Sequence, residues 1–259
     1  MIPTLSEIEI LAQQAGAILR ARYGNHQRVQ HKTTHTDLVT EVDHASERFI
    51  LEYLHLHYPD HQMIAEESGQ HGQNYAQSWL IDPLDGTVNY AHGIPIFCVS
   101  LAYAENGLVK LGVVYDPMRD ECFSAERAKG AWLNGQPIQI AQAHDLTQSL
   151  LVTGFPYDTF KAKENNLDHY ARFAVRSQGV RRLGSAALDL CYLAAGRFDG
   201  YWELRLSPWD VAAGALIAEE AGALVTNIQG ERNYLTPVPS ILAANAPLHA
   251  QMLSVLHGG

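Results

Sequence analysis

The chain has 259 residues, which corresponds to one large domain or two small ones. Its composition, 47% hydrophobic and 18% charged, is that of a soluble globular protein and excludes collagen-like, low-complexity and disordered chains. The net charge of −10 disfavours binding to a phosphate backbone, so a nucleic acid is not the expected partner. An acidic protein that handles an anionic small molecule needs metal cations or a local basic pocket.

The chain shows no pattern typical of a membrane or secreted protein. The most apolar stretch, residues 94–104, is interrupted by Pro95 and Ser100 and is too short for a membrane helix. The first ten residues lack the basic and apolar regions of a secretory signal, so we expect a cytoplasmic protein. The odd number of widely spaced cysteines indicates reduced core thiols rather than disulfides or a zinc site; they are Cys98, Cys122 and Cys191.

The first elements along the chain are helical. Thr4 and Glu7 have the capping-box spacing, and apolar residues then repeat at helical spacing as far as Gly24, which predicts a first helix. Asp43 fits the N-cap of a second helix that Pro59 ends.

Strands and further helices follow. A strand at residues 78–81 runs into a turn at residues 82–87. Strands at residues 97–103 and 108–115 are joined by a hairpin signal at residues 105–107, and residues 132–135 give another. The second half predicts strands at residues 150–153, 198–203, 223–226 and 241–244 and helices at residues 167–176, 186–195 and 209–221.

This mixture of helices, strands and hairpins predicts an α/β (α+β layered) fold of sheets and helices. The sequence shows no internal repeat and no linker. We therefore expect one compact domain over residues 1–259. Its two intimate halves are expected at about residues 1–145 and 146–259.

The first candidate site is an acidic turn directly after the apolar strand at residues 78–81. Asp82 and Asp85, three residues apart on a turn with Pro and Gly, are able to converge on one point, and their oxygens suit Mg²⁺. Gly86 permits close backbone approach, and the N–H groups of Gly86 and Thr87 are able to form a nest for phosphate oxygens. The alternative is an Asp-rich surface turn closed by side-chain to backbone hydrogen bonds.

Two further acidic motifs are weaker signals on their own. Glu66 and Glu67 follow a weakly apolar segment, and such a pair either ligates a cation or is simply solvated. Ser207, Pro208 and Asp210 have the N-cap, N1 and N3 pattern of a helix start. Capping alone explains Asp210, and so does a place in a metal site, because a helix N-terminus also orients a carboxylate.

A fourth acidic motif, residues 37–43, lies near a junction between a strand and a helix. Asp37 begins it and Asp43 ends it. Asp43 fits a helix N-cap as well as a functional carboxylate. Lys32, just upstream, is interpreted as a solvated loop residue.

Taken in chain order, these motifs resemble those of the inositol monophosphatase family. They are residues 37–43 (DLVTEVD), 66–68 (EES), 79–90 (WLIDPLDGTVNY) and 209–214 (WDVAAG), together with 153–157 (TGFPY) and 182–187 (RLGSAA), which resemble segments of bacterial members. The resemblance covers nearly the whole chain. It implies an αβαβα sandwich of the type shared with fructose-1,6-bisphosphatase. It also implies a homodimeric inositol-phosphate phosphatase, a phosphoric monoester hydrolase that requires Mg²⁺ and is inhibited by Li⁺.

Carried over residue by residue, the resemblance assigns metal ligands. Glu66, Asp82 and the backbone carbonyl of Leu84 match the ligands of a first Mg²⁺, and Asp82, Asp85 and Asp210 match those of a second. A third ion near the Glu66 position is held mostly by water, which gives two to three Mg²⁺ per site. A carboxylate that bridges two ions suits hydrolysis in which one ion activates the attacking water and the other stabilises the leaving oxygen.

The resemblance also assigns catalysis and substrate binding. Asp43 and Thr87 match the pair that orients the attacking water, and Glu66 joins them as a catalytic residue. Gly86 and Thr87 match the phosphate-binding turn. The residues that match contacts to the hydroxyl groups of the substrate are Asp85, Gly184, Ser185, Ala186 and Glu203. Glu203 also fits a surface acid at a strand end.

The expected substrate is a small phosphorylated polyol, myo-inositol monophosphate. Residues 88–90 (VNY) resemble inositol phosphatases more than the relatives that act on 3′-phosphoadenosine 5′-phosphate. That compound and fructose 1,6-bisphosphate remain alternatives with the same mechanism. Haloacid dehalogenase-like phosphatases fit poorly, because their two Asp residues are two positions apart and Asp82 and Asp85 are three apart.

A different class of function is a binding role in transcription. Some bacterial relatives act through RNA polymerase or transcription factors, and an intact metal site would not exclude such a role. Arg176, Arg181 and Arg182 are either a surface for such a partner or ordinary surface charge.

Overall fold

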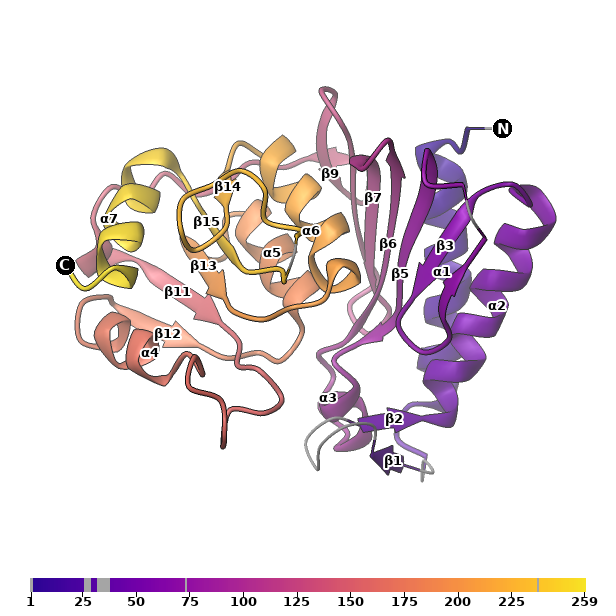
Figure 1. Ribbon diagram of the computed structural model, residues 1–259, viewed down its shortest axis with the longest axis horizontal. Coiled ribbons are helices and arrows are strands. Elements are labelled where there is room, and N and C mark those ends of the chain that lie inside the picture. The colour runs from indigo at the N-terminus through magenta and orange to yellow at the C-terminus, as the bar shows by residue number, and fades with distance from the viewer. Residues whose placement is uncertain (1, 26–28, 32–37, 73, 237) are drawn as a thin grey trace.

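Alternating layers of helices and sheets make up the molecule, a computed structural model that describes residues 2–25, 29–31, 38–72, 74–236 and 238–259 (Figure 1). In order, the layers are α1 (Leu5–Arg22) with α2 (Glu41–His57), an eight-stranded sheet, α5 (Ala186–Ala194) with α6 (Pro208–Glu220), a five-stranded sheet, and α4 (Leu167–Ala174) with α7 (Ala246–Leu256). The αβαβα fold expected from the resemblance is confirmed. Lys32 and Asp37 lie outside the described residues.

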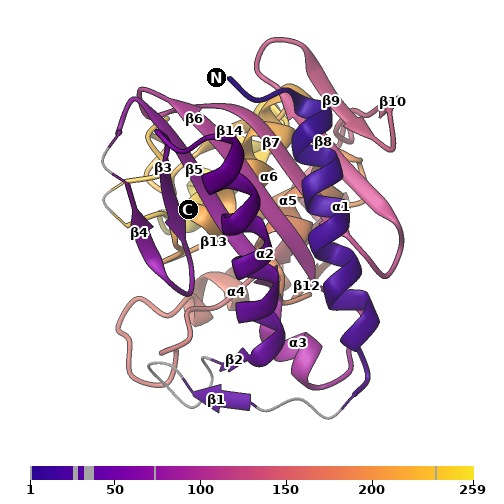
Figure 2. The ribbon, with the colours of Figure 1, turned by 90° about the vertical axis from the view of Figure 1, so that its right-hand side faces the viewer.

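The first helical layer covers one face of the larger sheet (Figure 2). α1 begins at the predicted capping box, in which Thr4 and Glu7 satisfy each other's backbone N–H groups. The predicted cap of α2 is wrong by one turn. Thr40 is the N-cap and Asp43 is the N3 residue, because the Asp43 carboxylate accepts hydrogen bonds from the backbone and hydroxyl of Thr40 at 2.9 and 2.6 Å.

The larger sheet has the strand order β10-β9-β8-β7-β6-β5-β3-β4. The predicted hairpins are confirmed, with Asn106 and Asn134 in left-handed backbone conformation at their tips. The prediction missed β3, β4 and β8, which are short and interspersed with polar residues. The strands are β3 (Gln62–Ala65), β4 (Gly69–His71), β5 (Gln77–Asp85), β6 (Cys98–Glu105), β7 (Leu108–Asp116), β8 (Glu121–Glu126), β9 (Gly130–Leu133) and β10 (Gln136–Pro137).

The predicted acidic turn at residues 82–87 begins later in the structure. β5 continues through Asp85, with a shift in its register against β6 between Asp82 and Asp85. Pro83 lies in this interval and has no N–H to donate to the sheet, which explains why the ladder is interrupted there. The chain turns at Gly86 into the short helix α3 (Thr87–Ala91).

The smaller sheet has the order β12-β11-β13-β15-β14 and mixes parallel and antiparallel pairs. Its strands are β11 (Leu150–Thr153), β12 (Gly179–Arg181), β13 (Gly200–Glu203), β14 (Leu224–Thr226) and β15 (Ile241–Ala244), with η1 (Leu146–Gln148) before it. β1 (Val29–His31) pairs separately with β2 (Leu38–Thr40). No helix was predicted at α7, although Asn245 caps it and Leu248, Met252 and Val255 are buried at helical spacing.

Apolar side chains fill the spaces between the layers in three clusters. The largest lies around α5 and α6, between the two sheets. All three cysteines are free and buried, which confirms the prediction of core thiols. Among the described residues, no helix is long and apolar enough to cross a membrane.

Candidate active site

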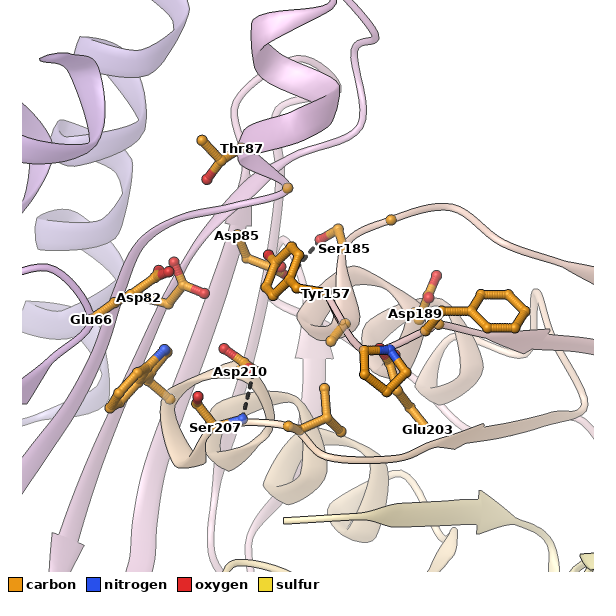
Figure 3. Close-up of a pocket in the computed structure, with 18 of the residues that line it drawn as sticks. Glu66, Asp82, Asp85, Thr87, Tyr157, Ser185, Asp189, Glu203, Ser207 and Asp210 are labelled. Carbon is orange, nitrogen blue, oxygen red and sulfur yellow. Dashed lines mark hydrogen bonds between the residues drawn. The ribbon is translucent and has the colours of Figure 1, made fainter. Parts of the chain in front are cut away.

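Glu66 and Asp82 emerge side by side from two parallel strands. The register of β3 and β5 pairs Ala65 with Ile81, and the backbone N–H of Glu66 donates to the Ile81 carbonyl at 3.1 Å. The next residue on each strand is therefore a carboxylate at the same edge of the sheet (Figure 3). Local register, rather than sequence proximity, brings these two acids together.

Three carboxylates in the pocket are oriented by the backbone. Asp82, Asp85 and Asp210 each commit one oxygen to a backbone N–H, which fixes the direction of the side chain. The pairs are Asp82 Oδ1 with Leu84 N at 3.0 Å, Asp85 Oδ2 with Ala187 N at 2.8 Å, and Asp210 Oδ2 with Ser207 N at 2.7 Å.

Asp210 reaches the pocket from a distant part of the chain because α6 begins there. Ser207 is the N-cap and Asp210 the N3 residue of α6, as the sequence predicts. The capping role and the place in the acidic pocket, which were alternatives at the level of sequence, coexist in the structure. The positive end of the α6 dipole favours a carboxylate at this position.

Gly86 makes the sharp turn that brings Thr87 into the site. Its φ is +99°, and a Cβ there would lie 2.8 Å from the carbonyl oxygen of Ile96. Only glycine meets both conditions. The turn places the backbone of Gly86 and the Thr87 hydroxyl at the pocket, directly after Asp85.

Thr87 links the pocket to Asp43. Its hydroxyl lies 2.9 Å from Asp43 Oδ1 and 3.0 Å from the Leu84 carbonyl oxygen. Thr87 and Asp43 are both buried. Asp43 therefore caps α2 with one oxygen and contacts the Thr87 hydroxyl with the other.

Burial and mutual repulsion raise the pKa values of the acidic cluster. The pKa of Asp82 lies well above its usual value, first because the group is buried and then because Glu66, Asp85 and Asp210 are close. Burial and the charge of Glu66 raise the pKa of Asp210 well above its usual value as well. Concentrated negative charge of this kind is stabilised by a cation.

Glu203 forms the opposite wall of the pocket. It is buried at the end of β13 and accepts a hydrogen bond from the Tyr201 hydroxyl at 2.7 Å. Burial raises its pKa to about 7. This placement excludes the alternative that Glu203 is a surface acid.

One pocket collects nearly all the predicted site residues (Figure 3). Asp43 does not line this pocket, but its carboxylate contacts Thr87, which does. Glu67 does not line the pocket, and its backbone N–H donates to Glu47 on α2. The predicted residues that line it are Glu66, Asp82, Leu84, Asp85, Gly86, Thr87, Gly184, Ser185, Ala186, Glu203 and Asp210.

Comparison with known proteins shows the family to which this chain belongs. The model of the inositol monophosphatase family matches residues 4–257. The chain belongs to the inositol monophosphatase family. It is 45% identical over 243 residues to the inositol-1-monophosphatase of Synechocystis, covering 93% of this chain and 84% of that protein. The predicted family is thus confirmed, and the chain belongs to a family of phosphatases.

One further related sequence and one solved structure are similar to this chain over nearly its whole length. The putative Nus factor SuhB of Neisseria meningitidis is 40% identical over 258 residues, which are 99% of this chain and 98% of that protein. The solved structure of the inositol monophosphatase from Anabaena superposes with a TM-score of 0.87 at 41% identity, covering 98% of this chain and 94% of that chain.

The donor chemistry of this family member fits a divalent metal. Of the six carboxylates that line the pocket, those of Glu66, Asp82, Asp85 and Asp210 lie close together, and oxygen ligands of this kind suit Mg²⁺. Within the described ranges, no three His, Cys, Asp or Glu side chains are grouped so as to hold a metal ion as they stand. The carboxylates are therefore an oriented donor set rather than a closed coordination shell.

Three charged residues that line the pocket were not predicted from the sequence as site residues: Arg182, Asp189 and Arg205. Asp189 on α5 is 1% exposed, and its Oδ1 has no hydrogen-bond partner among the described residues. The signal was an acid inside the apolar run of residues 186–194. Arg205 also lines the pocket, and no motif pointed to it.

Proposed function

We propose that this chain is a Mg²⁺-dependent phosphomonoesterase that hydrolyses myo-inositol monophosphate to inositol and phosphate. The observation that carries the proposal is the convergence of Glu66, Asp82, Asp85 and Asp210 beside the turn at Gly86 and Thr87. Membership of the inositol monophosphatase family supports the same reaction.

Metal binding falls to the acidic side of the pocket. Glu66, Asp82 and the Leu84 carbonyl would hold one Mg²⁺, and Asp82, Asp85 and Asp210 a second. Bound Mg²⁺ supplies positive charge that lowers the pKa of water and offsets the charge of the phosphate. The backbone N–H groups that orient Asp82, Asp85 and Asp210 reduce the freedom that these side chains lose on binding an ion.

Thr87 and Asp43 orient the attacking water. The Thr87 hydroxyl donates a hydrogen bond to Asp43 Oδ1. Its oxygen is then able to accept a hydrogen bond from a water molecule. A water that donates to this oxygen has its own lone pair directed away from Thr87, towards the phosphate site. Asp43 is held for this role by the hydroxyl and backbone of Thr40.

The polyol lies against the wall formed by α5 and β13. Glu203 and Asp85 accept hydrogen bonds from its hydroxyl groups. Gly184, Ser185 and Ala186, at the start of α5, line the same wall of the pocket.

Phosphate release by the purified chain tests the substrate. The panel contains D- and L-inositol 1-phosphate, fructose 1,6-bisphosphate and 3′-phosphoadenosine 5′-phosphate, with Mg²⁺ titrated and Li⁺ added. We expect Mg²⁺-dependent preference for inositol 1-phosphate and inhibition by Li⁺. Preference for another member of the panel would contradict the substrate, and turnover without divalent metal would contradict the mechanism.

Relatives named SuhB favour a second role, binding to the transcription machinery. Two of them, the putative Nus factor of Neisseria meningitidis and the Nus factor of Escherichia coli, are each 40% identical to this chain over nearly its whole length. Arg176 and Arg181 are exposed around β12 and offer a basic surface for such a partner, whereas Arg182, which is also exposed, lines the acidic pocket. Retention of purified RNA polymerase by the immobilised chain, and its loss when Arg176 and Arg181 are replaced by Ser, would support this role.

A homodimer is the proposed assembly. Light scattering coupled to size-exclusion chromatography distinguishes a dimer of about 57 kDa from the 28.6 kDa monomer.

A further inference from the structure

The carboxylate of Asp85, at the end of β5, is anchored on the start of α5. Its Oδ2 accepts a hydrogen bond from the Ser185 hydroxyl at 2.6 Å (Figure 3) and another from the backbone N–H of Ala187 at 2.8 Å. Ser185 is the N-cap of α5, a helix of nine residues, and lies 100 positions from Asp85 in the sequence. The positive end of the helix dipole also favours a carboxylate there. The anchor therefore joins the larger sheet to the helical layer between the two sheets.

The Ser185 hydroxyl has one proton, and its contacts decide where that proton goes. When Asp85 is ionised, as a metal ligand must be, its carboxylate only accepts hydrogen bonds, so the hydroxyl is the donor. The hydroxyl oxygen in turn accepts a hydrogen bond from the backbone N–H of Leu188 at 3.4 Å. Ser185 is 1% exposed although it lines the pocket. Its side chain is therefore engaged with Asp85 and with its own helix rather than with the open space of the pocket.

The strand that carries Asp85 is irregular at this point. The register between β5 and β6 shifts between Asp82 and Asp85, and the chain turns at Gly86 immediately afterwards. Cys98, the partner of Asp85 across the sheet, is buried and places its Sγ 3.8 Å from Asp85 Oδ2 and 3.6 Å from Ser185 Oγ. A thiol is a weak hydrogen-bond donor, so Ser185 supplies the strong contact from a side chain. That contact reaches Oδ2, which leaves Oδ1 for a metal ion.

We infer that Ser185 is a positioning residue, whose hydroxyl holds the Asp85 carboxylate in place for the second Mg²⁺ and does not contact the substrate. Groups that hydrogen-bond to a metal ligand fix its orientation, and their loss weakens metal binding. This role differs from the one that the resemblance assigns to Ser185, which is a contact to the hydroxyl groups of the substrate. The inference rests on the proposed Mg²⁺-dependent function and adds to it a residue that acts on the metal through Asp85.

Calorimetric titration of Mg²⁺ into the metal-free chain tests this role without turnover. In Ser185→Ala we expect the dissociation constant of at least one Mg²⁺ to rise about tenfold or more. The Mg²⁺ concentration that gives half-maximal kcat should rise by the same factor. At saturating Mg²⁺ the KM for inositol 1-phosphate should change less than about threefold, because the hydroxyl makes no contact with the substrate.

Two further variants separate the contact to Asp85 from the loss of a helix cap. Ser185→Thr keeps the hydroxyl in a residue that also caps helices, so its Mg²⁺ dissociation constants should stay within about threefold of wild type. Asn245→Ala removes a buried N-cap outside the pocket, whose side chain accepts a hydrogen bond from the Leu248 N–H at 3.0 Å. It should lower Tm, as Ser185→Ala does, and leave Mg²⁺ binding unchanged.

A double-mutant cycle tests whether Ser185 acts through Asp85. Asp85→Asn by itself should weaken Mg²⁺ binding, because it removes the negative charge of a ligand. On this background, Ser185→Ala should raise the remaining Mg²⁺ dissociation constant less than about twofold, since the carboxylate that it positions is already gone.

The results that would overturn the inference differ from those that would refute the proposed function. Unchanged Mg²⁺ binding in Ser185→Ala, or a rise in KM alone, would overturn the positioning role. Equal losses of Mg²⁺ affinity in Ser185→Ala and Asn245→Ala, or fully additive losses with Asp85→Asn, would overturn it as well. A wild-type chain that binds Mg²⁺ but hydrolyses none of the phosphate esters would refute the proposed function, while the calorimetry still decides the role of Ser185.

Discussion

The Thr87 hydroxyl lies 2.9 Å from Asp43 Oδ1, across 44 residues of sequence. The contact joins the first residue of α3 to the first turn of α2, and both residues are buried. Asp43 also receives two hydrogen bonds from Thr40, so its carboxylate is fixed before any water or substrate arrives. A pair held in this way is able to orient one water without large rearrangement.

Replacing Thr87 by Val should abolish this orientation while keeping the shape of the side chain. We expect kcat to fall about a hundredfold, in the range typical of positioned proton-transfer groups, with a small change in KM. Thr87→Ser keeps the hydroxyl and should retain activity within about tenfold of wild type. Steady-state kinetics of both variants provide the test, and equal losses in Val and Ser would show that the methyl group rather than the hydroxyl matters.

Replacing Asp85 or Asp210 by Asn should remove turnover without unfolding the chain. Each substitution takes away one negative oxygen ligand while the volume stays nearly the same, and we expect kcat to fall about a hundredfold or more. Circular dichroism should show the helix content of wild type. A folded variant that turns over at ordinary Mg²⁺ concentration would contradict the two-metal assignment.

Removal of divalent metal should make stability depend on pH in a defined direction. The folded-state pKa values of Asp82 and Asp210 are raised above their usual value, so the contribution of these two groups to the stability of the metal-free protein is greatest at low pH and is lost as they ionise. Mg²⁺ reverses this loss because it binds the ionised carboxylates of the folded state. The rise in Tm on adding Mg²⁺ should therefore be larger at pH 8 than at pH 5. A rise that is equal at both pH values would argue against binding at this cluster.

Glu203 should contribute its own pH dependence. Its pKa in the folded protein is about 7, against 4.5 for an ordinary glutamic acid side chain, because the group is buried. Between these pH values the folded state holds a proton that the unfolded chain has released, so stability falls as pH rises through this window, by on the order of 3 kcal/mol. Denaturant unfolding of Glu203→Gln at pH 5 and pH 8 should show a smaller fall than wild type, and an identical fall would exclude Glu203 as its source.

The buried carboxyl group of Asp189 should lower the free energy of unfolding. Its Oδ1 is buried without a hydrogen-bond partner among the described residues, and such a group destabilises a protein by about 1–3 kcal/mol. Asp189→Leu should therefore raise the free energy of unfolding. Asp116 is the matched control, because it is equally buried but accepts hydrogen bonds from Met118, Arg119 and Tyr192. Asp116→Leu should lower the free energy of unfolding by about 3–5 kcal/mol. If Asp189→Leu also lowers it, the prediction for Asp189 is wrong.

Local patterns in the sequence determined the elements whose causes are local. The capping box at Thr4, the hairpin tips at Asn106 and Asn134 and the start of α6 at Ser207 depend on neighbouring residues only, and each was predicted within a few positions. The order of the acidic motifs also indicated the family and the layered fold. Asp43 was misplaced as the N-cap because Thr40 competes for the same role three residues earlier.

The tertiary structure alone decided which of these residues meet. Glu66 lies beside Asp82 because of the register between β3 and β5, and Asp210 joins them because α6 packs against the larger sheet. Asp189 and Arg205 became candidates only when burial and position in the pocket were known. Hydrogen-bonding patterns of a few residues set caps and turns, whereas the meeting of side chains more than a hundred positions apart follows from the packing of whole layers.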